Sequence, residues 1–256
     1  KYLIDNTNRL VCKSFNFLYN KISKEIIYKV FIKEKYDIEV AFYEGLPTEF
    51  VSFSSQNSIK IAWLHTNQER LYQNMPAKEL KDKTKIYQKF NEIVGVSQSV
   101  VASFTKFFES LPAVHLYNPL NEQIITERSE LPLNKRMNVK PYFITVGRLI
   151  PIKGYDRLIS ALATLKKENY DFNLIIVGDG FKRLFLEDFA AKQGVSENII
   201  FYGHADNPYP LIKNADLFIC SSIQEGLSTV VTEALILGVP IVTTHCSGMN
   251  ELDRKS

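Results

Sequence analysis

The sequence predicts an α/β protein with two mostly parallel sheets, and three observations support this fold class. Short runs rich in β-branched residues alternate with longer helical patterns along most of the chain, which is typical of βαβ units. The 256 residues suffice for two hydrophobic cores of about 100–150 residues each. Apolar residues make up 45% and charged residues 23% of the chain, as in an average soluble globular protein.

In the first half of the chain we expect four strands and three helices. The strands fall at residues 38–43, 59–65, 92–96 and 113–117, and the helices near 21–35, 78–90 and 98–109. The first helix carries Leu18, Ile22, Ile26 and Val30 at four-residue spacing. This stripe fits a helix packed on a sheet, and it also fits an interfacial helix that touches lipid headgroups, so both interpretations stay open.

The second half repeats the scheme with five expected strands, each followed by a helix or a helical turn. They fall at residues 142–146, 174–177, 199–202, 217–220 and 240–243. Between the halves, Asn118, Pro119 and Pro132 punctuate a polar stretch that is typical of a connection. We therefore predict a first domain over 1–118, a linker over 119–140 and a second domain over 141–256.

Charge and cysteine content exclude several classes of protein. The net charge is +3, and residues 1–118 carry 16 Lys and Arg against 12 Asp and Glu. This excess of positive charge is too small for a nucleic-acid-binding surface, but it is compatible with loose attraction to an anionic membrane. Three distant cysteines without CxxC spacing indicate neither a disulfide framework nor a zinc site, so a reducing cytoplasm fits best.

The sequence shows neither a membrane-spanning segment nor a targeting signal at its start. No run of about 18 apolar residues is long enough to span a membrane. The start at Lys1 shows neither an initiator Met nor a signal-peptide pattern. We expect the chain to be a fragment that lacks both natural ends.

The first candidate site is the loop after the predicted strand 142–146. Gly147 ends the strand, and Arg148 and Lys153 place two cations on the loop before Gly154 and the next helix. In a parallel α/β sheet, ligands bind at the carboxyl ends of the strands, so a diphosphate would suit this loop. Taken alone, the two residues also fit as solvated surface cations beside a turn.

The second candidate site is the segment 221–240, in which a strand ends and a Glu-Gly turn leads into a helix. Ser228 fits the N-cap, and the amides of Leu227 to Val230 would then point toward an anion above the turn. Glu225 and Glu233 lie near this helix start. Carboxylates would repel a diphosphate, so the expected partners are the hydroxyls of a ribose and of a sugar, as in a nucleotide-sugar.

The second half resembles the retaining glycosyltransferases of family 4 over most of residues 141–252. The resemblance rests on E-x7-E at Glu225 and Glu233 followed by A-L-x-x-G-V-P-I-V. It is extended by V-G-R-L-x-P-x-K-G at 146–154, V-G-D-G at 177–180, F-Y-G-H at 201–204 and A-D-L-F-I-C-S-S at 215–222.

The first half resembles bacterial surface-polysaccharide transferases of the same family less specifically. The matching segments are D-I-E-V-A-F-Y-E-G-L-P-T at 37–48, K-I-A-W-L-H-T at 60–66, G-V-S at 95–97 and Y-N-P at 117–119. The resemblance implies the GT-B fold, in which two Rossmann-like domains face each other across a cleft. The second domain would hold the donor and the first the acceptor.

The resemblance also implies roles for individual residues. Arg148 and Lys153, with Gly147 beside them, would hold the donor phosphates, Glu233 the ribose and Glu225 the hydroxyls of the transferred sugar. Further donor contacts would come from the amides of Gly226, Leu227 and Ser228, from Gly203 and His204 near the base, and from His65. His65 at a strand end, and the side chain of His204, also fit purely structural roles.

The expected function is transfer of a sugar, of the hexosyl type and with retention, from a nucleotide-sugar to a glycan or lipid-linked acceptor. UDP is the expected nucleotide, and capsule, exopolysaccharide or lipopolysaccharide synthesis is the expected setting. The resemblance implies that the leaving diphosphate helps to deprotonate the acceptor while cations absorb its charge, so no dedicated protein base is needed and electrostatic stabilisation would dominate. No metal or other cofactor is expected. The protein would be cytoplasmic, with peripheral contact at the inner face of the membrane through its N-terminal domain.

Three alternatives remain beside this function. A non-catalytic GT-B partner subunit that binds a nucleotide-sugar and a sugar-nucleotide epimerase both fit the fold. A glycoside hydrolase fits poorly, because its two carboxyls would lie about 5–9.5 Å apart. Eight helical positions would separate Glu225 from Glu233 by about 12 Å along the axis.

Overall fold

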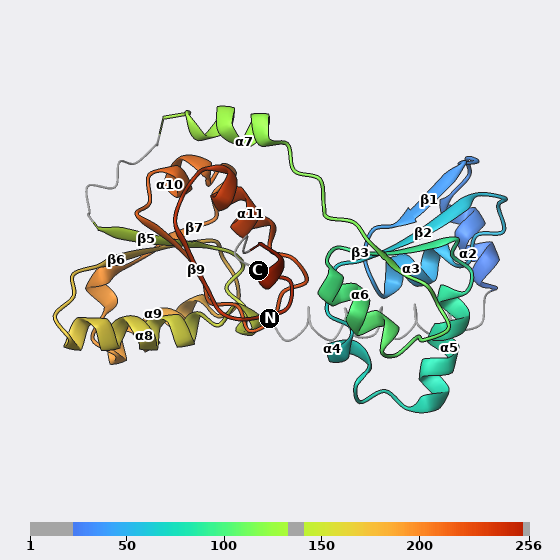
Figure 1. Ribbon diagram of the computed structural model, residues 1–256, viewed down its shortest axis with the longest axis horizontal. Coiled ribbons are helices and arrows are strands. Elements are labelled where there is room, and N and C mark those ends of the chain that lie inside the picture. Colours follow the sequence, from blue (N-terminus) through green and yellow to red (C-terminus); the bar gives the residue numbers. More distant parts are fainter. Residues whose placement is uncertain (1–22, 133–140, 253–256) are drawn as a thin grey trace, which may run out of the picture. The chain divides into compact units, whose positions relative to one another are not determined.

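The computed structural model describes residues 23–132 and 141–252, and it is an α/β structure with two parallel sheets. The chain divides into two compact units, Lys1–Leu116 and Tyr117–Ser256, each built around its own sheet (Figure 1). This division lies close to residue 118, the predicted end of the first domain. No described helix is both long enough and apolar enough to cross a membrane.

The first unit contains four parallel strands in the order β1-β2-β3-β4. The strands are β1 (Ile38–Ala41), β2 (Ile59–Leu64), β3 (Glu92–Gly95) and β4 (Val114–His115). The helices are α2 (Lys24–Phe31), α3 (Leu46–Val51), α4 (Glu69–Tyr72), α5 (Ala77–Tyr87) and α6 (Gln98–Thr105). All four strands were predicted, whereas the short helices α3 and α4 were not.

An aromatic cluster fills the core of the first unit beside the sheet. The rings of Tyr87 and Phe104 lie 5.0 Å apart, and those of Phe104 and Phe108 lie 4.7 Å apart. Helix α6 begins at Ser97, whose Oγ accepts a hydrogen bond from the amide of Val100 at 3.2 Å. This N-cap fixes the turn that leads from β3 into the aromatic core.

Helix α2 does not bury the apolar stripe that was expected to pack on a sheet. Ile26 and Val30 are exposed, whereas Tyr28 is buried and donates a hydrogen bond to Oε1 of Glu39 at 2.8 Å. The other two members of the predicted stripe, Leu18 and Ile22, lie outside the described residues. The prediction of a packed stripe is therefore wrong for the described part, because the helix buries the face that carries Tyr28.

The second unit contains five parallel strands in the order β7-β6-β5-β8-β9. The strands are β5 (Tyr142–Val146), β6 (Asn173–Val177), β7 (Ile199–Gly203), β8 (Leu217–Cys220) and β9 (Ile241–Thr243). The helices are α7 (Glu122–Ser129), α8 (Tyr155–Lys167), α9 (Arg183–Lys192), α10 (Tyr209–Lys213) and α11 (Thr229–Ile236), with short 3₁₀ turns η1 (Pro151–Lys153), η2 (Ser196–Asn198) and η3 (Asn250–Leu252). The strand order reverses at β5, so this unit has a topological switch point between β5 and β8.

Both faces of this second sheet are buried, as the near-continuous apolar strands predict. Alternate residues of β6 serve opposite cores: Ile175 and Val177 face the cluster that includes Val231 of α11, and Leu174 and Ile176 face the one that includes Ile159 of α8. Figure 1 shows α8 and α9 on one face of the sheet and α10 and α11 on the other. The unit is thus doubly wound.

The predicted linker 119–140 contains helix α7, and its residues 133–140 lie outside the described part of the structure. The helix begins at Asn121, whose Oδ1 accepts from the amide of Ile124 at 2.9 Å. It packs against α10 and α11, and Nη2 of Arg128 donates to the carbonyl of Asp206 at 2.9 Å. The first part of the segment therefore belongs to the second unit.

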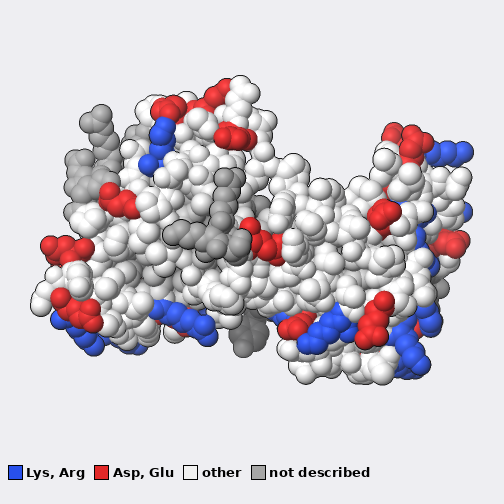
Figure 2. All heavy atoms as spheres, in the orientation of Figure 1, with Lys and Arg blue, Asp and Glu red and all other residues white. Residues whose placement is uncertain are grey.

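Charged side chains are mixed over the visible face of each unit. Figure 2 shows Lys and Arg beside Asp and Glu, without one continuous basic band among the described residues on that face. This distribution agrees with the net charge of +3. It gives no support to a nucleic-acid partner.

Candidate functional site

The candidate site lies at the switch point of the second unit, where β5 and β8 end side by side. Residues 147–154 follow β5, and residues 221–228 follow β8 and lead into α11. The two loops are distant in sequence, but they meet because their strands pair in parallel. Ligands of open α/β sheets bind at such an edge.

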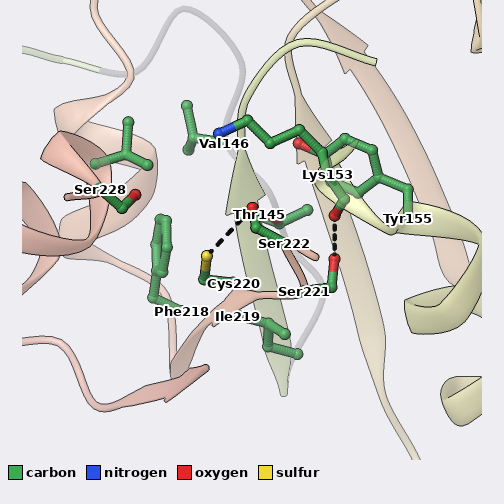
Figure 3. Close-up of a pocket in the computed structure, with 11 residues that line it drawn as sticks. Thr145, Val146, Lys153, Tyr155, Phe218, Ile219, Cys220, Ser221, Ser222 and Ser228 are labelled. Atoms are coloured by element: carbon green, nitrogen blue, oxygen red, sulfur yellow. Dashed lines mark hydrogen bonds between the residues drawn. The ribbon is translucent and has the colours of Figure 1, made fainter. Parts of the chain in front are cut away.

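Two hydrogen bonds hold the two loops together. The Oγ of Ser221 donates to the carbonyl of Lys153 at 2.8 Å, and the amide of Ile223 donates to the carbonyl of Ile152 at 2.8 Å (Figure 3). Gly154 has a φ of +61°, and a Cβ added there would lie 2.3 Å from the carbonyl oxygen of Ser221. A glycine is required at this position both for the left-handed backbone and for the close approach.

An ion pair joins the two predicted motifs. The Nζ of Lys153 lies 2.6 Å from Oε1 of Glu225, and the Oγ of Ser222 donates to the same oxygen at 2.6 Å. The side chains of Lys153 and Glu225 are 21% and 15% exposed, so water screens the pair only in part. Both described donors use Oε1, and Oε2 accepts no hydrogen bond from a described residue.

A small cavity lies beside Lys153. Its volume is about 10 Å³, and its walls include Thr145 and Val146 of β5, Lys153, Ser222 and Ser228. Figure 3 shows the side chain of Lys153 extending over β5 toward Val146, with Ser228 on the opposite side. The space holds about one water molecule, so a larger ligand would have to lie over it.

The start of α11 differs in one detail from the prediction. Ser228 occupies the N-cap position, but its side chain makes no capping hydrogen bond, so the capping role of its hydroxyl was wrong. The amides of Leu227 and Ser228 donate to no acceptor among the described residues. These amides and the positive end of the helix dipole remain available for an anion.

A third loop supports the Glu-Gly turn from behind. Gly248 has a φ of +81°, and a Cβ added there would lie 1.9 Å from the carbonyl oxygen of Gly226. The Oγ of Ser247 donates to the carbonyl of Glu225 at 3.1 Å. The position of Glu225 therefore depends on the segment after β9 as well as on β8.

Glu233 lies in α11 and has its own partner. The hydroxyl of Tyr209 donates to Oε1 of Glu233 at 3.1 Å. Burial raises the pKa of Glu233 above its ordinary value, and the hydrogen bond from Tyr209 partly opposes this shift. The guanidinium carbon of Arg128 lies 5.5 Å from the centre of the Tyr209 ring, so α7 also supports the arrangement.

The other predicted donor residues of the second unit, Gly147, Arg148, Gly203 and His204, form no hydrogen bond or ion pair with Lys153 or Glu225. A Cβ added to Gly147 would lie 2.9 Å from the hydroxyl oxygen of Tyr155, so this glycine leaves space for the Tyr155 side chain. Arg148 is exposed, and its side chain forms no ion pair with any described residue. Gly203 ends β7, and the exposed ring of His204 places Nε2 3.2 Å from Oδ1 of Asp206.

His65 belongs to the first unit and follows β2. Its ring packs against Phe42 and Tyr43, with centroids 4.7 Å and 5.7 Å away, and its Nε2 is buried without a hydrogen-bond partner. Burial lowers the pKa of this imidazole, which favours the neutral form. These contacts describe its place in the first unit only, so its predicted role at the donor stays a prediction.

Metal-ligating groups and cysteines were also compared with the predictions. Within residues 23–132 and 141–252, no group of three or more His, Cys, Asp or Glu side chains could hold a metal ion. Cys220 and Cys246 are buried and free, and Cys12 lies outside the described residues.

Sequence reasoning missed two side chains that hold the predicted carboxylates. Ser222 contacts Glu225 from three residues away, within the motif A-D-L-F-I-C-S-S, so its hydroxyl was a visible candidate. Tyr209 contacts Glu233 from 24 residues away, and no local pattern marks it. Both contacts arise from the packing of β8, α10 and α11.

Comparison with known proteins identifies relatives of both halves of the chain. The family described as "Glycosyl transferases group 1" matches residues 128–254. An uncharacterized glycosyltransferase of Methanocaldococcus jannaschii is 27% identical over 201 residues, which cover 75% of this chain and 49% of that protein. The chain thus spans about half the length of curated relatives that it matches.

A second relative has a more specific name. The N-acetylgalactosamine-N,N'-diacetylbacillosaminyl-diphospho-undecaprenol 4-alpha-N-acetylgalactosaminyltransferase of Campylobacter jejuni is 27% identical over 228 residues. The match covers 81% of this chain and 60% of that protein.

Among solved structures, HepE of Anabaena in complex with UDP and glucose is similar in fold. It superposes with a TM-score of 0.73 at 19% identity over 90% of this chain and 65% of that chain. The predicted fold class, an α/β chain with the parallel sheets of GT-B proteins, is confirmed.

Proposed function

We propose that this chain, which belongs to the glycosyl transferases group 1 family, transfers a sugar from a nucleotide-sugar donor to a glycan or lipid-linked acceptor. One observation carries the proposal for the site. The 2.6 Å contact between Nζ of Lys153 and Oε1 of Glu225 brings the cationic loop after β5 to the Glu-Gly turn before α11. A cation, a carboxylate and the free amides of a helix start then share one edge of the sheet.

These groups suit different parts of one donor. The ammonium of Lys153 and the amides of Leu227 and Ser228 would bind the diphosphate, because all of them carry positive charge or partial charge. The exposed guanidinium of Arg148 would reach the same phosphates, and Gly147, next to it in the chain, would also contact the donor. Glu225 would turn its free Oε2 to the hydroxyls of the transferred sugar, since it would repel phosphate.

The nucleoside would bind farther along α11. Glu233 would accept hydrogen bonds from the ribose diol through Oε2, because Tyr209 already occupies Oε1. Gly203 and His204, at the carboxyl end of β7, would contact the base mainly through backbone atoms. HepE was solved with UDP and glucose, and we propose a UDP-linked hexose as the donor of this chain too.

Transfer would proceed with retention of configuration. As the bond from the sugar to the diphosphate breaks, negative charge grows on the leaving phosphate, and Lys153, Arg148 and the start of α11 would stabilise it. The leaving phosphate would take the proton of the attacking acceptor hydroxyl, so the mechanism assigns no protein base. These fixed positive groups supply the charge stabilisation that a divalent cation provides in other enzymes, and His65 would contact the donor sugar.

The acceptor side of the proposal rests on relatives. The Campylobacter jejuni protein is named for a diphospho-undecaprenol acceptor. We propose a glycan or lipid-linked acceptor of the same general class here, in bacterial capsule, exopolysaccharide or lipopolysaccharide synthesis. For such an acceptor we propose a cytoplasmic enzyme in peripheral contact with the inner face of the cell membrane.

A binding screen tests the donor role directly. The purified protein is titrated with UDP-glucose, GDP-glucose and ADP-glucose while its unfolding temperature is followed, beside Glu233→Ala and the control Glu197→Ala. Glu197 is an exposed carboxylate of the same unit without a described partner. One donor should stabilise the wild type and the control but not Glu233→Ala; equal shifts in all three proteins would refute the ribose role.

A further inference from the structure

The first unit contains a cavity that the donor site does not use. Its volume is about 370 Å³, within the usual range of about 300–1,000 Å³ for small-molecule sites. Tyr43, Glu44 and Gly45 follow β1, and Thr66 follows β2, so the cavity lies at the carboxyl ends of two parallel strands. The remaining wall comes from the segment around α4 and from α5: Arg70, Leu71, Tyr72, Met75 and Lys83.

Glu44 places a fixed carboxyl group in the wall of this cavity. Only 7% of the residue is exposed, and Oε1 accepts hydrogen bonds from the amides of His65 and Thr66 at 2.8 and 2.5 Å and from Nε2 of Gln68 at 3.0 Å. Oε2 is buried and has no partner. An unpaired buried oxygen of this kind is costly, and a ligand hydroxyl would satisfy it.

The cavity also has a cation without a counter-charge. Lys83 is paired with Glu49, but Arg70 is exposed and forms no ion pair with Glu44 or any other described residue. A guanidinium presents a planar fork that matches the two oxygens of a carboxylate or phosphate. The cavity therefore has one group suited to hydroxyls and another suited to an anion.

The other walls are suited to the apolar faces of a ring. Tyr43 is half exposed, whereas Tyr72 is buried, with its hydroxyl 3.2 Å from that of Tyr87. Leu71 and Met75 supply further apolar surface. A sugar ring has C–H faces for such walls and hydroxyls around its edge, so it matches the mixture of groups better than a purely apolar or purely ionic ligand.

We infer that this cavity binds a sugar that carries an acidic group, either a carboxylate or a phosphate. Arg70 binds the acidic group, and Oε2 of Glu44 accepts a hydrogen bond from a ring hydroxyl. The inference rests on the proposed function, because the ligand is then the terminal residue of the acceptor. It narrows the acceptor class from any glycan to an anionic one.

Calorimetric titration of the protein without donor tests this inference. The probes are glucuronate, glucose 6-phosphate, glucose and inorganic phosphate, and the proteins are wild type, Arg70→Met and Lys81→Met. Lys81 is an exposed lysine of α5 that does not line the cavity, so it controls for lost surface charge. Arg70 is exposed, so its replacement should leave the fold intact; circular dichroism checks this.

At least one acidic sugar should bind the wild type and Lys81→Met at least tenfold more tightly than glucose does, and Arg70→Met should lose that preference. Glucuronate and glucose 6-phosphate separate a carboxylate from a phosphate source. Equal affinity for inorganic phosphate and glucose 6-phosphate, or no preference for either acidic sugar, would overturn the inference. A parallel titration with UDP distinguishes the acidic-sugar proposal from the donor-site proposal. UDP binding without acidic-sugar binding would contradict only the acidic-sugar proposal.

Discussion

The Nζ of Lys153 lies 2.6 Å from Oε1 of Glu225, although 72 positions separate the two residues in the sequence. In the free protein the opposite charges of this pair compensate each other, and Lys153 lines the same small cavity as Ser228 at the start of α11. A bound diphosphate would compete with Glu225 for the same ammonium. Glu225 would then be free to turn toward the hydroxyls of the sugar.

Replacement of Lys153 by Met should therefore impair transfer more than it impairs folding. Loss of one charge-assisted contact with the leaving phosphate costs about 1.5–3 kcal/mol, which corresponds to a fall in kcat/KM of roughly 10- to 150-fold. Lys167→Met, at an exposed lysine of α8 without a described partner, should behave like the wild type. Steady-state kinetics with the donor identified by the binding screen measure both; an unchanged kcat/KM in Lys153→Met would exclude the phosphate role.

Tyr209 should control the pH at which the donor binds. Glu233 must be ionised to accept hydrogen bonds from a ribose, so donor affinity should fall as the pH falls through the pKa of this carboxyl. Burial raises that pKa, and the hydroxyl of Tyr209 holds it down. In Tyr209→Phe the pKa should rise further, so the loss of affinity should begin at a higher pH than in the wild type.

Donor titrations between pH 4.5 and 8 compare the wild type, Tyr209→Phe and the control Tyr170→Phe. Tyr170 is an exposed tyrosine of the same unit, and its variant should retain the wild-type profile. If Tyr209→Phe only lowered affinity by the same factor at every pH, the proposed control of Glu233 ionisation would be wrong.

The buried imidazole of His65 should make the first unit less stable in mild acid. Burial lowers its pKa from the ordinary value of 6.5. Below pH 6.5 the unfolded chain binds a proton that the folded chain does not, so this contribution to stability is complete above pH 6.5 and falls as the pH decreases. The loss ends once the pH is below the lowered pKa of the folded state.

Replacement by Phe should remove this dependence, because the ring still packs against Phe42 and Tyr43 and no proton binds. The gain in stability of His65→Phe over the wild type should be larger at pH 5.5 than at pH 7.5 in urea unfolding followed by circular dichroism. His204→Phe provides the matched control at a side chain that is 77% exposed. A gain that did not change with pH would show that the imidazole titrates alike in the folded and unfolded chains.

Two glycines with similar backbone angles test how tightly the loops of the proposed donor site are joined. Gly154 and Gly194 have φ values of +61° and +73°, but an added Cβ meets the carbonyl of Ser221 at Gly154 and nothing within 4 Å at Gly194. Ala at either position costs about 1–2 kcal/mol for the left-handed backbone. Gly154→Ala should lose at least about 1 kcal/mol more, since two backbone segments must separate.

Chemical denaturation measures this difference, and donor titration of the same proteins measures its effect on the site. Gly154→Ala should also bind the donor more weakly, because the clash moves Lys153 away from Glu225. Equal stability losses in the two variants would mean that the loops separate at no cost.

The predictability of the fold differs between central and peripheral elements. The bounds of β5 and β8 match the predicted 142–146 and 217–220, because both strands are apolar runs that turns delimit. The predicted strand 113–117 is shorter, since only Val114 and His115 pair with β3. Helix α7 was missed because its segment is polar, although Asn121 carried a readable N-cap signal.

For the site, features set by a short stretch of sequence could be predicted, whereas contacts between distant segments could not. Residue type and spacing predicted Lys153, Glu225, Ser228 and Glu233 as site residues, because strand ends and helix starts can be recognised from short stretches of sequence. The structure brings Lys153 and Glu225 together, and the roles of all four residues at a donor stay predictions. The direct contact between Lys153 and Glu225 was not predicted, and neither was the role of Tyr209. Both depend on how β8, α10 and α11 pack, which no short window of sequence contains.

Gly248 packs so closely against the carbonyl of Gly226 that the Glu-Gly turn and the loop after β9 cannot move independently. Any side chain at Gly248 would displace the carbonyl of Gly226 and, with it, the neighbouring Glu225. A substitution in the loop after β9 can therefore move the carboxylate of the candidate site without changing any residue of the two loops that form this site.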